Sequence, residues 1–223
     1  MPDSQILRLP DALARLRALP RSFFDHDPRL VAPELVGKVL LRRWRGKLLA
    51  GRIVELEAYL GAEDPAAHSA AGQTARNAVL FGPPGHAYVY FIYGNHWCLN
   101  VSCMKTGDAG CLLFRALEPL AGLPEMARMR GIELPSAAAG DVPPRTLRML
   151  TSGPGRLCQA LAITRPRDNG KDLTKPSSGL WMADDGFVPS SIRTTSRIGI
   201  TKAAEQPLRY VIAGNPFVSK QSF

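Results

Sequence analysis

The sequence lacks any long uncharged apolar run. Its longest apolar stretches, 87–92 and 110–114, are far shorter than the roughly twenty residues that a membrane-spanning helix needs. Charged residues interrupt the leucines of residues 1–20, which breaks the pattern of a signal peptide. We therefore expect a protein that is not exported and has no membrane partner. The expected location is the cytoplasm, at the nucleoid or other DNA, or the nucleus in a eukaryotic source.

Cysteine and histidine are also scarce, with four of each in 223 residues. The cysteines form no Cys-x-x-Cys pair and the histidines stand singly, so the spacing of zinc ligands is missing. Structural disulfides are rare in a reducing cytosol. We expect reduced thiols and no metal site.

Acidic residues are fewer than basic ones. The chain has 28 Lys and Arg against 19 Asp and Glu, a formal net charge of +9, which favours an anionic partner such as nucleic acid. Many arginine-rich proteins are basic without binding DNA. The charge is therefore only corroboration for a nucleic-acid partner.

The remaining composition is that of a folded domain. Hydrophobic residues make up 45% of the chain, and no internal repeat or linker separates two parts. The patterns predict alternating strands, tight turns and short helices in one core. Predicted strands cover 38–43, 47–59, 87–92, 97–104, 110–118, 180–183, 193–200 and 208–213. Predicted helices cover 29–35, 120–130, 146–150 and 154–162, with a loop of one or two helical turns over 62–85.

The strand 47–59 carries the first candidate site. Alternation places Glu55, Glu57 and Tyr59 on one face, a pattern that an ordinary solvated sheet face also produces. Arg115 lies in an apolar strand, where a guanidinium needs a nearby carboxylate. A carboxylate beside Arg115 would stay ionised near neutral pH, as a general base must. A purely structural ion pair is an equally good interpretation of these residues.

Aromatic side chains form the second candidate set. Tyr88 and Tyr90 share one face of a strand, and Tyr93 lies at the hairpin turn that follows, where the pair Gly94-Asn95 suits a tight turn with positive φ. An exposed tyrosine at such a turn has little to pack against, but it could fill the gap left when a nucleotide is extruded from a duplex. His68 stands alone in a loop, where a histidine is more often structural than catalytic.

Together these segments resemble the alkyladenine (3-methyladenine) DNA glycosylases, in the order of that family's motifs and over roughly Phe23–Ser219. The matching segments are Gly51–Gly61, Ala67–Ser69, Tyr88–Gly94, Asn100–Ser102, Leu113–Pro119, Ser152–Leu161, Arg197–Ile200 and Gly214–Ser219. The resemblance implies a single mixed α/β (α+β) domain over 23–223 after an extension over 1–22. A curved antiparallel sheet, flanking helices and a protruding β-hairpin are expected.

The activity that the resemblance implies is monofunctional cleavage of the N-glycosidic bond of a damaged purine in double-stranded DNA, without a cofactor. Glu57 matches the general base that activates water and Arg115 the residue that holds the water and the carboxylate. A main-chain carbonyl near Ile198 should complete the water site. We expect a monomer with no obligate protein partner.

The resemblance also assigns the base pocket. Tyr59, His68 and Tyr90 match the walls around the flipped base, Asn100 the residue that disfavours guanine, and Tyr93 the intercalating tyrosine. Arg76 is the expected phosphate contact. Lys105, Arg156 and Lys202 are equally well explained as phosphate contacts or as solvated charges. Expected substrates are 3-methyladenine and 7-methylguanine, and also hypoxanthine and ethenoadenine.

Three alternatives have their own sequence requirements. A non-catalytic damage binder would keep the aromatic residues and lose Glu57 or Arg115, and both are present. A zinc nucleobase deaminase needs His-x-Glu and Pro-Cys-x-x-Cys, and neither occurs. A bifunctional lyase needs an amine nucleophile, and no lysine falls in the pocket motifs. The run Asn95-His96-Trp97, after Tyr93, departs from the motif of the family that the sequence resembles. Any role of the hairpin other than intercalation therefore stays open.

Overall fold

Strand β3 (Lys47–Tyr59) is the centre of the fold, because it pairs with β2 (Val39–Trp44), β6 (Gly110–Ala121) and β9 (Arg209–Ile212). The computed structural model describes residues 16–135 and 142–219, and in them one open sheet of nine strands forms. Its main path runs β1-β7-β2-β3-β6-β5-β4, and β9 joins β8 to the side of β3. The predicted single domain of mixed α/β class is confirmed.

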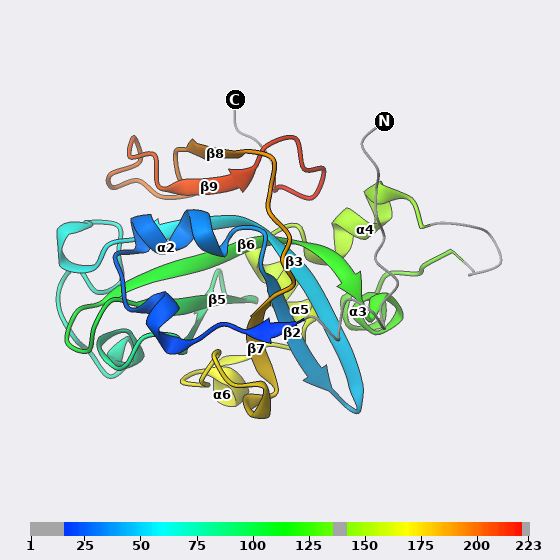
Figure 1. Ribbon diagram of the computed structural model, residues 1–223, viewed down its shortest axis with the longest axis horizontal. Coiled ribbons are helices and arrows are strands. Elements are labelled where there is room, and N and C mark those ends of the chain that lie inside the picture. The colour runs from blue at the N-terminus through cyan, green and yellow to red at the C-terminus, as the bar shows by residue number, and fades with distance from the viewer. Residues whose placement is uncertain (1–15, 136–141, 220–223) are drawn as a thin grey trace.

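The other strands and the five described α-helices surround this axis. The strands are β1 (Arg17–Ala18), β4 (Ala87–Ile92), β5 (His96–Cys103), β7 (Leu180–Asp184) and β8 (Ile192–Thr195). The helices are α2 (Pro28–Leu35), α3 (Leu123–Arg130), α4 (Pro144–Thr151), α5 (Pro154–Ala160) and α6 (Arg165–Asp168). Figure 1 shows β8 and β9 above the long strands and α6 on the opposite side. No helix in the described ranges is both long enough and apolar enough to cross a bilayer.

Proline fixes where several helices begin. Pro28, Pro144 and Pro154 each stand in the first turn, where a missing N–H costs no intrahelical hydrogen bond. The Asp27 carboxylate caps α2 by accepting the Arg29 backbone N–H at 2.7 Å. These local signals explain why the predicted helices 29–35, 146–150 and 154–162 are present with ends shifted by a few residues.

Three predictions of local structure need correction. Strand β6 continues to Ala121, so the helix predicted from 120 begins only at Leu123, after Gly122 takes a left-handed φ of 76°. The strand predicted over 193–200 ends at Thr195, and the chain then leaves the sheet. Helix α6 was not predicted, because Arg-Pro-Arg-Asp has no apolar periodicity.

The predicted extension over residues 1–22 falls partly outside the described part of the chain, which begins at residue 16. Within the described part, β1 pairs with β7 through Arg17 opposite Asp184 and Ala18 opposite Ala183. The turn Arg21–Phe24 follows and buries Phe24 in the main core.

The core lies on the face of the sheet that α2 and α5 cover. Leu56 and Phe114 from the two central strands are fully buried there, together with Leu157 and Cys158 of α5. Helix α5 packs on β5 and β6. The opposite face of β4, β5 and β6 is left for a second cluster, which contains Tyr88, Tyr90 and Leu113.

Candidate active site

Directly opposed residues on four neighbouring strands bring residues of the site into one row across the sheet. Tyr88 on β4 pairs with Asn100 on β5, and Asn100 pairs in turn with Leu113 on β6. Leu113 pairs with Glu57 on β3. Directly opposed residues of a sheet point to the same face. Strand pairing alone therefore places an aromatic side chain, an amide and a carboxylate on one face.

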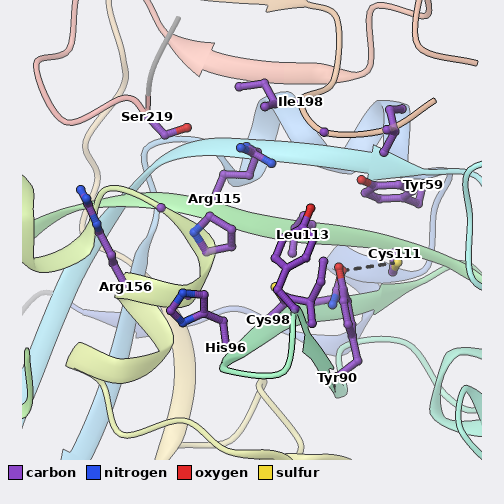
Figure 2. Close-up of a pocket in the computed structure, with 18 of the residues that line it drawn as sticks. Tyr59, Tyr90, His96, Cys98, Cys111, Leu113, Arg115, Arg156, Ile198 and Ser219 are labelled. Carbon is purple, nitrogen blue, oxygen red and sulfur yellow. Dashed lines mark hydrogen bonds between the residues drawn. The ribbon is translucent and has the colours of Figure 1, made fainter. Parts of the chain in front are cut away.

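A cavity of about 990 Å³ opens on this face. Figure 2 shows Tyr59, Tyr90 and Cys111 on one side of it and His96 and Arg156 on the other. Small-molecule sites enclose about 300–1,000 Å³, so the cavity is large enough for a nucleotide. One side is aromatic and the other basic, which suits a flat ring that carries a phosphate.

Two irregularities in the β3–β6 ladder aim Arg115 at the carboxylates. The register shifts on both sides of Glu55, so that Glu55 faces Ala116 and Leu56 faces Phe114, which leaves Arg115 without a partner residue on β3. Arg115 is buried, and its side chain is only 10% exposed. Its Nε donates to Glu55 Oε1 at 3.0 Å, and its Nη1 lies 3.2 Å from Glu57 Oε1. One guanidinium therefore bridges both glutamates.

Glu57 is fully buried and is held from three sides, by one ion pair and two hydrogen bonds. Besides Arg115, the backbone N–H of Ile198 donates to its Oε1 at 2.7 Å and the Tyr59 hydroxyl to its Oε2 at 3.1 Å. Burial raises the pKa of Glu57, and Arg115 opposes this only in part. Glu57 does not itself line the cavity, but the three residues that hold it do.

Glu55 has the opposite balance. Its Oε1 accepts from Arg209 Nε at 2.7 Å and from the Ser219 hydroxyl at 2.8 Å, and its Oε2 accepts from the Ser219 N–H at 2.6 Å. Burial by itself would raise the pKa of Glu55, but Arg115 and Arg209 outweigh burial and lower it. Glu55 is therefore a stable anion beneath the site.

The aromatic wall is built by packing as well as by hydrogen bonds. His68 meets Tyr90 edge to face, with ring centroids 4.5 Å apart, and its Nδ1 lies 3.0 Å from the Tyr88 hydroxyl. Burial, and next to it the charge of Arg76, lowers the pKa of His68. Asn100 Nδ2 donates to the Tyr88 carbonyl at 3.1 Å, which fixes its amide in the wall of the cavity.

Tyr93 lies at the tip of the β4–β5 hairpin and is 79% exposed. The positive φ values of the turn fall at Tyr93, 53°, and Gly94, 71°, one position earlier than the predicted Gly94-Asn95 pair. A non-glycine residue in this region is strained. The tyrosine ring nevertheless borders the cavity mouth.

Comparison with known proteins identifies the chain. The family model of methylpurine-DNA glycosylases matches residues 22–216. The chain belongs to the methylpurine-DNA glycosylase family. Proteins named as 3-methyladenine DNA glycosylases are similar over nearly their full length. One from Koribacter versatilis is 62% identical over 95% of this chain and 98% of its own. One from Rhodopseudomonas palustris is 48% identical over 96% of both, and one from Alkaliphilus oremlandii 42% over 91% and 99%.

As a methylpurine-DNA glycosylase, the protein is an enzyme that hydrolyses N-glycosyl bonds in DNA. The residues singled out from the sequence lie together: Glu57 and Arg115 are in direct contact, and the other predicted pocket residues line one cavity. Those lining residues are Tyr59, His68, Tyr90, Tyr93 and Asn100. Their catalytic and binding roles remain predictions.

The predicted phosphate contacts are less uniform in this glycosylase. Arg76 is exposed, and its guanidinium carbon lies 6.0 Å from the centroid of the Tyr90 ring, close to the aromatic wall. Arg156 lines the cavity. Lys105 is exposed and 4.0 Å from Asp108, and Lys202 is also exposed; neither borders the cavity.

Sequence patterns missed the outer support of the site. Arg197 holds both oxygens of Asp64, at 2.5 and 3.0 Å, and its guanidinium carbon lies 4.7 Å from the centroid of Tyr59. This places Ile198 next to Glu57, to which its N–H donates, and the predicted role of a carbonyl near Ile198 in the water site stays a prediction. Arg197 stands in a matching motif and Asp64 lies between two of them, but only the fold pairs the two residues. Within the described residues no group of His, Cys, Asp and Glu is arranged to hold a metal.

Proposed function

We propose that this glycosylase turns a damaged purine out of duplex DNA into the cavity and hydrolyses its N-glycosidic bond with a water molecule activated by Glu57. The proposed substrates are 3-methyladenine and 7-methylguanine, with hypoxanthine and ethenoadenine as neutral lesions, and the product is an abasic site. The observation that carries the proposal is a buried carboxylate with a raised pKa held at the cavity by Arg115 and the Ile198 N–H.

The proposed reaction needs one base and one leaving group. The water oxygen attacks C1′, the bond from C1′ to the purine nitrogen breaks with its electron pair on the base, and Glu57 takes the proton. C1′ gains oxocarbenium character, which a nearby carboxylate stabilises. Because burial raises the pKa of Glu57, its ionised form binds a proton more tightly than an exposed glutamate does.

The aromatic wall favours alkylated purines. Tyr59, His68 and Tyr90 would enclose the flipped base, and rings of this kind attract a cationic base through their π faces. The lowered pKa of His68 keeps this histidine neutral at pH 7, so that it does not repel such a base. A cationic base is also the better leaving group, so binding and chemistry favour the same lesions.

Asn100 is the proposed filter against guanine. Its Nδ2 already donates to the Tyr88 carbonyl, which fixes the side chain in the wall of the cavity. The exocyclic amine of guanine would meet this amide and lose its hydrogen bonds to water. Alkylated guanine leaves easily enough to tolerate weaker binding.

The proposed DNA contacts surround the cavity mouth. Tyr93 would enter the duplex in place of the extruded nucleotide, which offsets an unstacking cost of a few kcal/mol. Arg76 and Arg156 are close enough to the pocket to bind the flanking phosphates. The net charge of +9 supports attraction to the duplex. We propose a monomer that works on chromosomal DNA without an obligate protein partner.

The proposed enzyme is monofunctional. A lyase step requires an amine that attacks C1′ and forms a Schiff base. Among the described residues, those that line the cavity include arginines and histidines but no lysine. Water is then the nucleophile, and the abasic strand is left intact.

The test is single-turnover release of 3-methyladenine and hypoxanthine from lesion-bearing duplexes. Wild-type protein and Glu57→Gln are compared, and duplex binding is recorded for each. The matched control is Glu118→Gln, because Glu118 lies on β6 and accepts from Asn215 at 3.1 Å, away from the cavity. We expect Glu57→Gln to bind and to release no base, while the control behaves as wild type.

Two outcomes would contradict the proposal. Release by Glu57→Gln at the wild-type rate would remove Glu57 from the reaction. Wild-type protein that binds lesion duplexes and releases no base would make the chain a damage binder.

A further inference from the structure

Glu55 is as deeply buried as Glu57 and has no part in the proposed reaction. Its two oxygens accept hydrogen bonds from Arg115, Arg209 and Ser219, at 2.6 to 3.0 Å. These partners come from β6, from β9 and from the segment after β9. Burying an ionised carboxylate is costly even when it is paired. The cost points to a use for the negative charge of Glu55.

The guanidinium of Arg115 links the two glutamates in a fixed geometry. Its Nε donates to Glu55, and its Nη1 faces Glu57. A guanidinium is planar and rigid, so a hydrogen bond at Nε sets the direction of both terminal nitrogens. Glu55 therefore decides where Arg115 presents its charge to Glu57.

We propose that Glu55 is a positioning residue for the hydrolysis. It orients Arg115 toward Glu57 and offsets part of the positive charge of Arg115, so that Glu57 stays a strong base. This inference rests on the proposed role of Glu57. Glu55 acts through Arg115 and touches neither the DNA nor the water.

The charges around the pair fix the sign of the effect. The titratable groups that interact with Glu57 are Arg115 from β6, Cys98 from β5, Tyr59 and Glu55 from its own strand, and Arg197 from the segment after β8. The groups on Glu55 are Arg115, Arg209 from β9 and the Ser219 hydroxyl. Like charges disfavour ionisation of each other. Glu55 is among the groups that raise the pKa of Glu57, and Arg115 lowers it.

Two substitutions should therefore move the pH profile in opposite directions. Glu55→Gln removes the competing anion, so Arg115 acts on Glu57 alone and the pKa of Glu57 falls. Arg209→Gln removes the other cation from Glu55, which then draws more strongly on Arg115, so the pKa of Glu57 rises. A residue that only supports the fold would change the rate without moving the profile.

The experiment measures single-turnover release of 3-methyladenine across pH for wild type, Glu55→Gln, Arg209→Gln and the control Glu118→Gln. We expect Glu55→Gln to lower the plateau rate by about tenfold to a hundredfold, because Arg115 loses its orientation. In a plot of release rate against pH, the rise on the acid side (the acid limb) should move to lower pH for Glu55→Gln and to higher pH for Arg209→Gln. Melting curves verify that each variant is folded.

Acid limbs that stay at the wild-type pH in both variants would overturn the inference, whatever happens to the rates. Should Glu55→Gln fail to fold, the limb of Arg209→Gln decides alone. The two proposals remain separable. Unmoved limbs together with an inactive Glu57→Gln variant reject only the role of Glu55. An active Glu57→Gln variant rejects the role of Glu57, and the role of Glu55 falls with it.

Discussion

The charged cluster beneath the cavity, which we call the floor, and the tip of the β4–β5 hairpin are built in opposite ways. At the floor, Glu55, Glu57 and Arg115 are buried and bound to one another. At the tip, Tyr93 is 79% exposed and sits on a strained backbone. Burial of the charges at the floor costs stability but fixes their positions. The strained backbone at the tip also costs stability, but it holds the Tyr93 ring out in solvent.

The difference teaches that chemistry and DNA probing can be separated by mutation. Buried charges depend on each other, so a change at the floor should alter both the stability of the fold, in either direction, and catalysis. An exposed side chain makes few contacts, so loss of the Tyr93 ring should reduce DNA binding and lesion release without lowering stability. The predictions below test this contrast, beginning with the largest expected effect.

Arg115→Ala should cause the largest loss, because it leaves two buried carboxylates without their shared partner. We expect a loss of about 3–5 kcal/mol in the free energy of unfolding, measured by urea denaturation, and no base release. Arg29→Ala is the control, since its pair with Asp27 is half exposed and worth less than about 1 kcal/mol. Equal losses in the two variants would show that the floor is not held by its charges.

Tyr93→Ala should reduce lesion release by about tenfold to a hundredfold, because the duplex loses the side chain that fills the gap. The urea midpoint should stay at the wild-type value. Fluorescence of a base analogue opposite the lesion would report flipping directly. Unchanged release with normal folding would remove the tip from the mechanism.

The two glutamates should respond to neutralisation with opposite signs. The fold raises the pKa of Glu57, so its stability contribution is present at low pH and is lost as pH rises through the raised value. The fold lowers the pKa of Glu55, so its contribution is present at neutral pH and is lost as pH falls through the lowered value.

At pH 7 we therefore expect Glu57→Gln to raise the free energy of unfolding and Glu55→Gln to lower it, each by about 1 kcal/mol. Urea melts at pH 7 and pH 5 measure both changes. The gain of Glu57→Gln should shrink at pH 5. A loss of stability in both variants would mean that the two carboxylates are equivalent parts of one ion cluster.

The smallest expected effect is the difference in stability between Tyr93→Gly and Tyr93→Ala. Glycine relieves the positive φ and loses some backbone entropy on folding, so we expect it to be about 0.5–1 kcal/mol more stable than Tyr93→Ala. Lesion release should be equally low in both variants, because both lack the ring. Equal stability would show that the tip carries no strain.

Much of the fold could be predicted, because alternation and turn residues act locally. The strand over 47–59 has the predicted ends, and the Tyr93 turn was displaced by one residue. Helix α6 has no apolar periodicity, so no pattern marked it. Strand β8 ends at Thr195, opposite the residue at which its partner β9 begins, and a local pattern does not contain this pairing.

The site was predicted to the extent that its residues share a strand or a motif. Glu57 and Tyr59 follow from alternation, and the interpretation of Arg115 as a buried cation with acidic partners agrees with its contacts. The register shifts that aim Arg115 were not predictable, because they depend on the pairing of two strands. The same holds for Arg209 and Ser219, which reach Glu55 from distant segments.

The contacts that complete the floor span most of the chain. Ile198 reaches Glu57 across 141 residues, and Ser219 reaches Glu55 across 164. Contacts between residues this far apart in the chain raise the contact order of the fold, so we expect them to form late in folding. A chain still emerging from the ribosome already holds both glutamates and the aromatic hairpin, but not the segments that orient them. We therefore expect a nascent or half-folded chain to lack glycosylase activity until these segments have docked on Glu55 and Glu57.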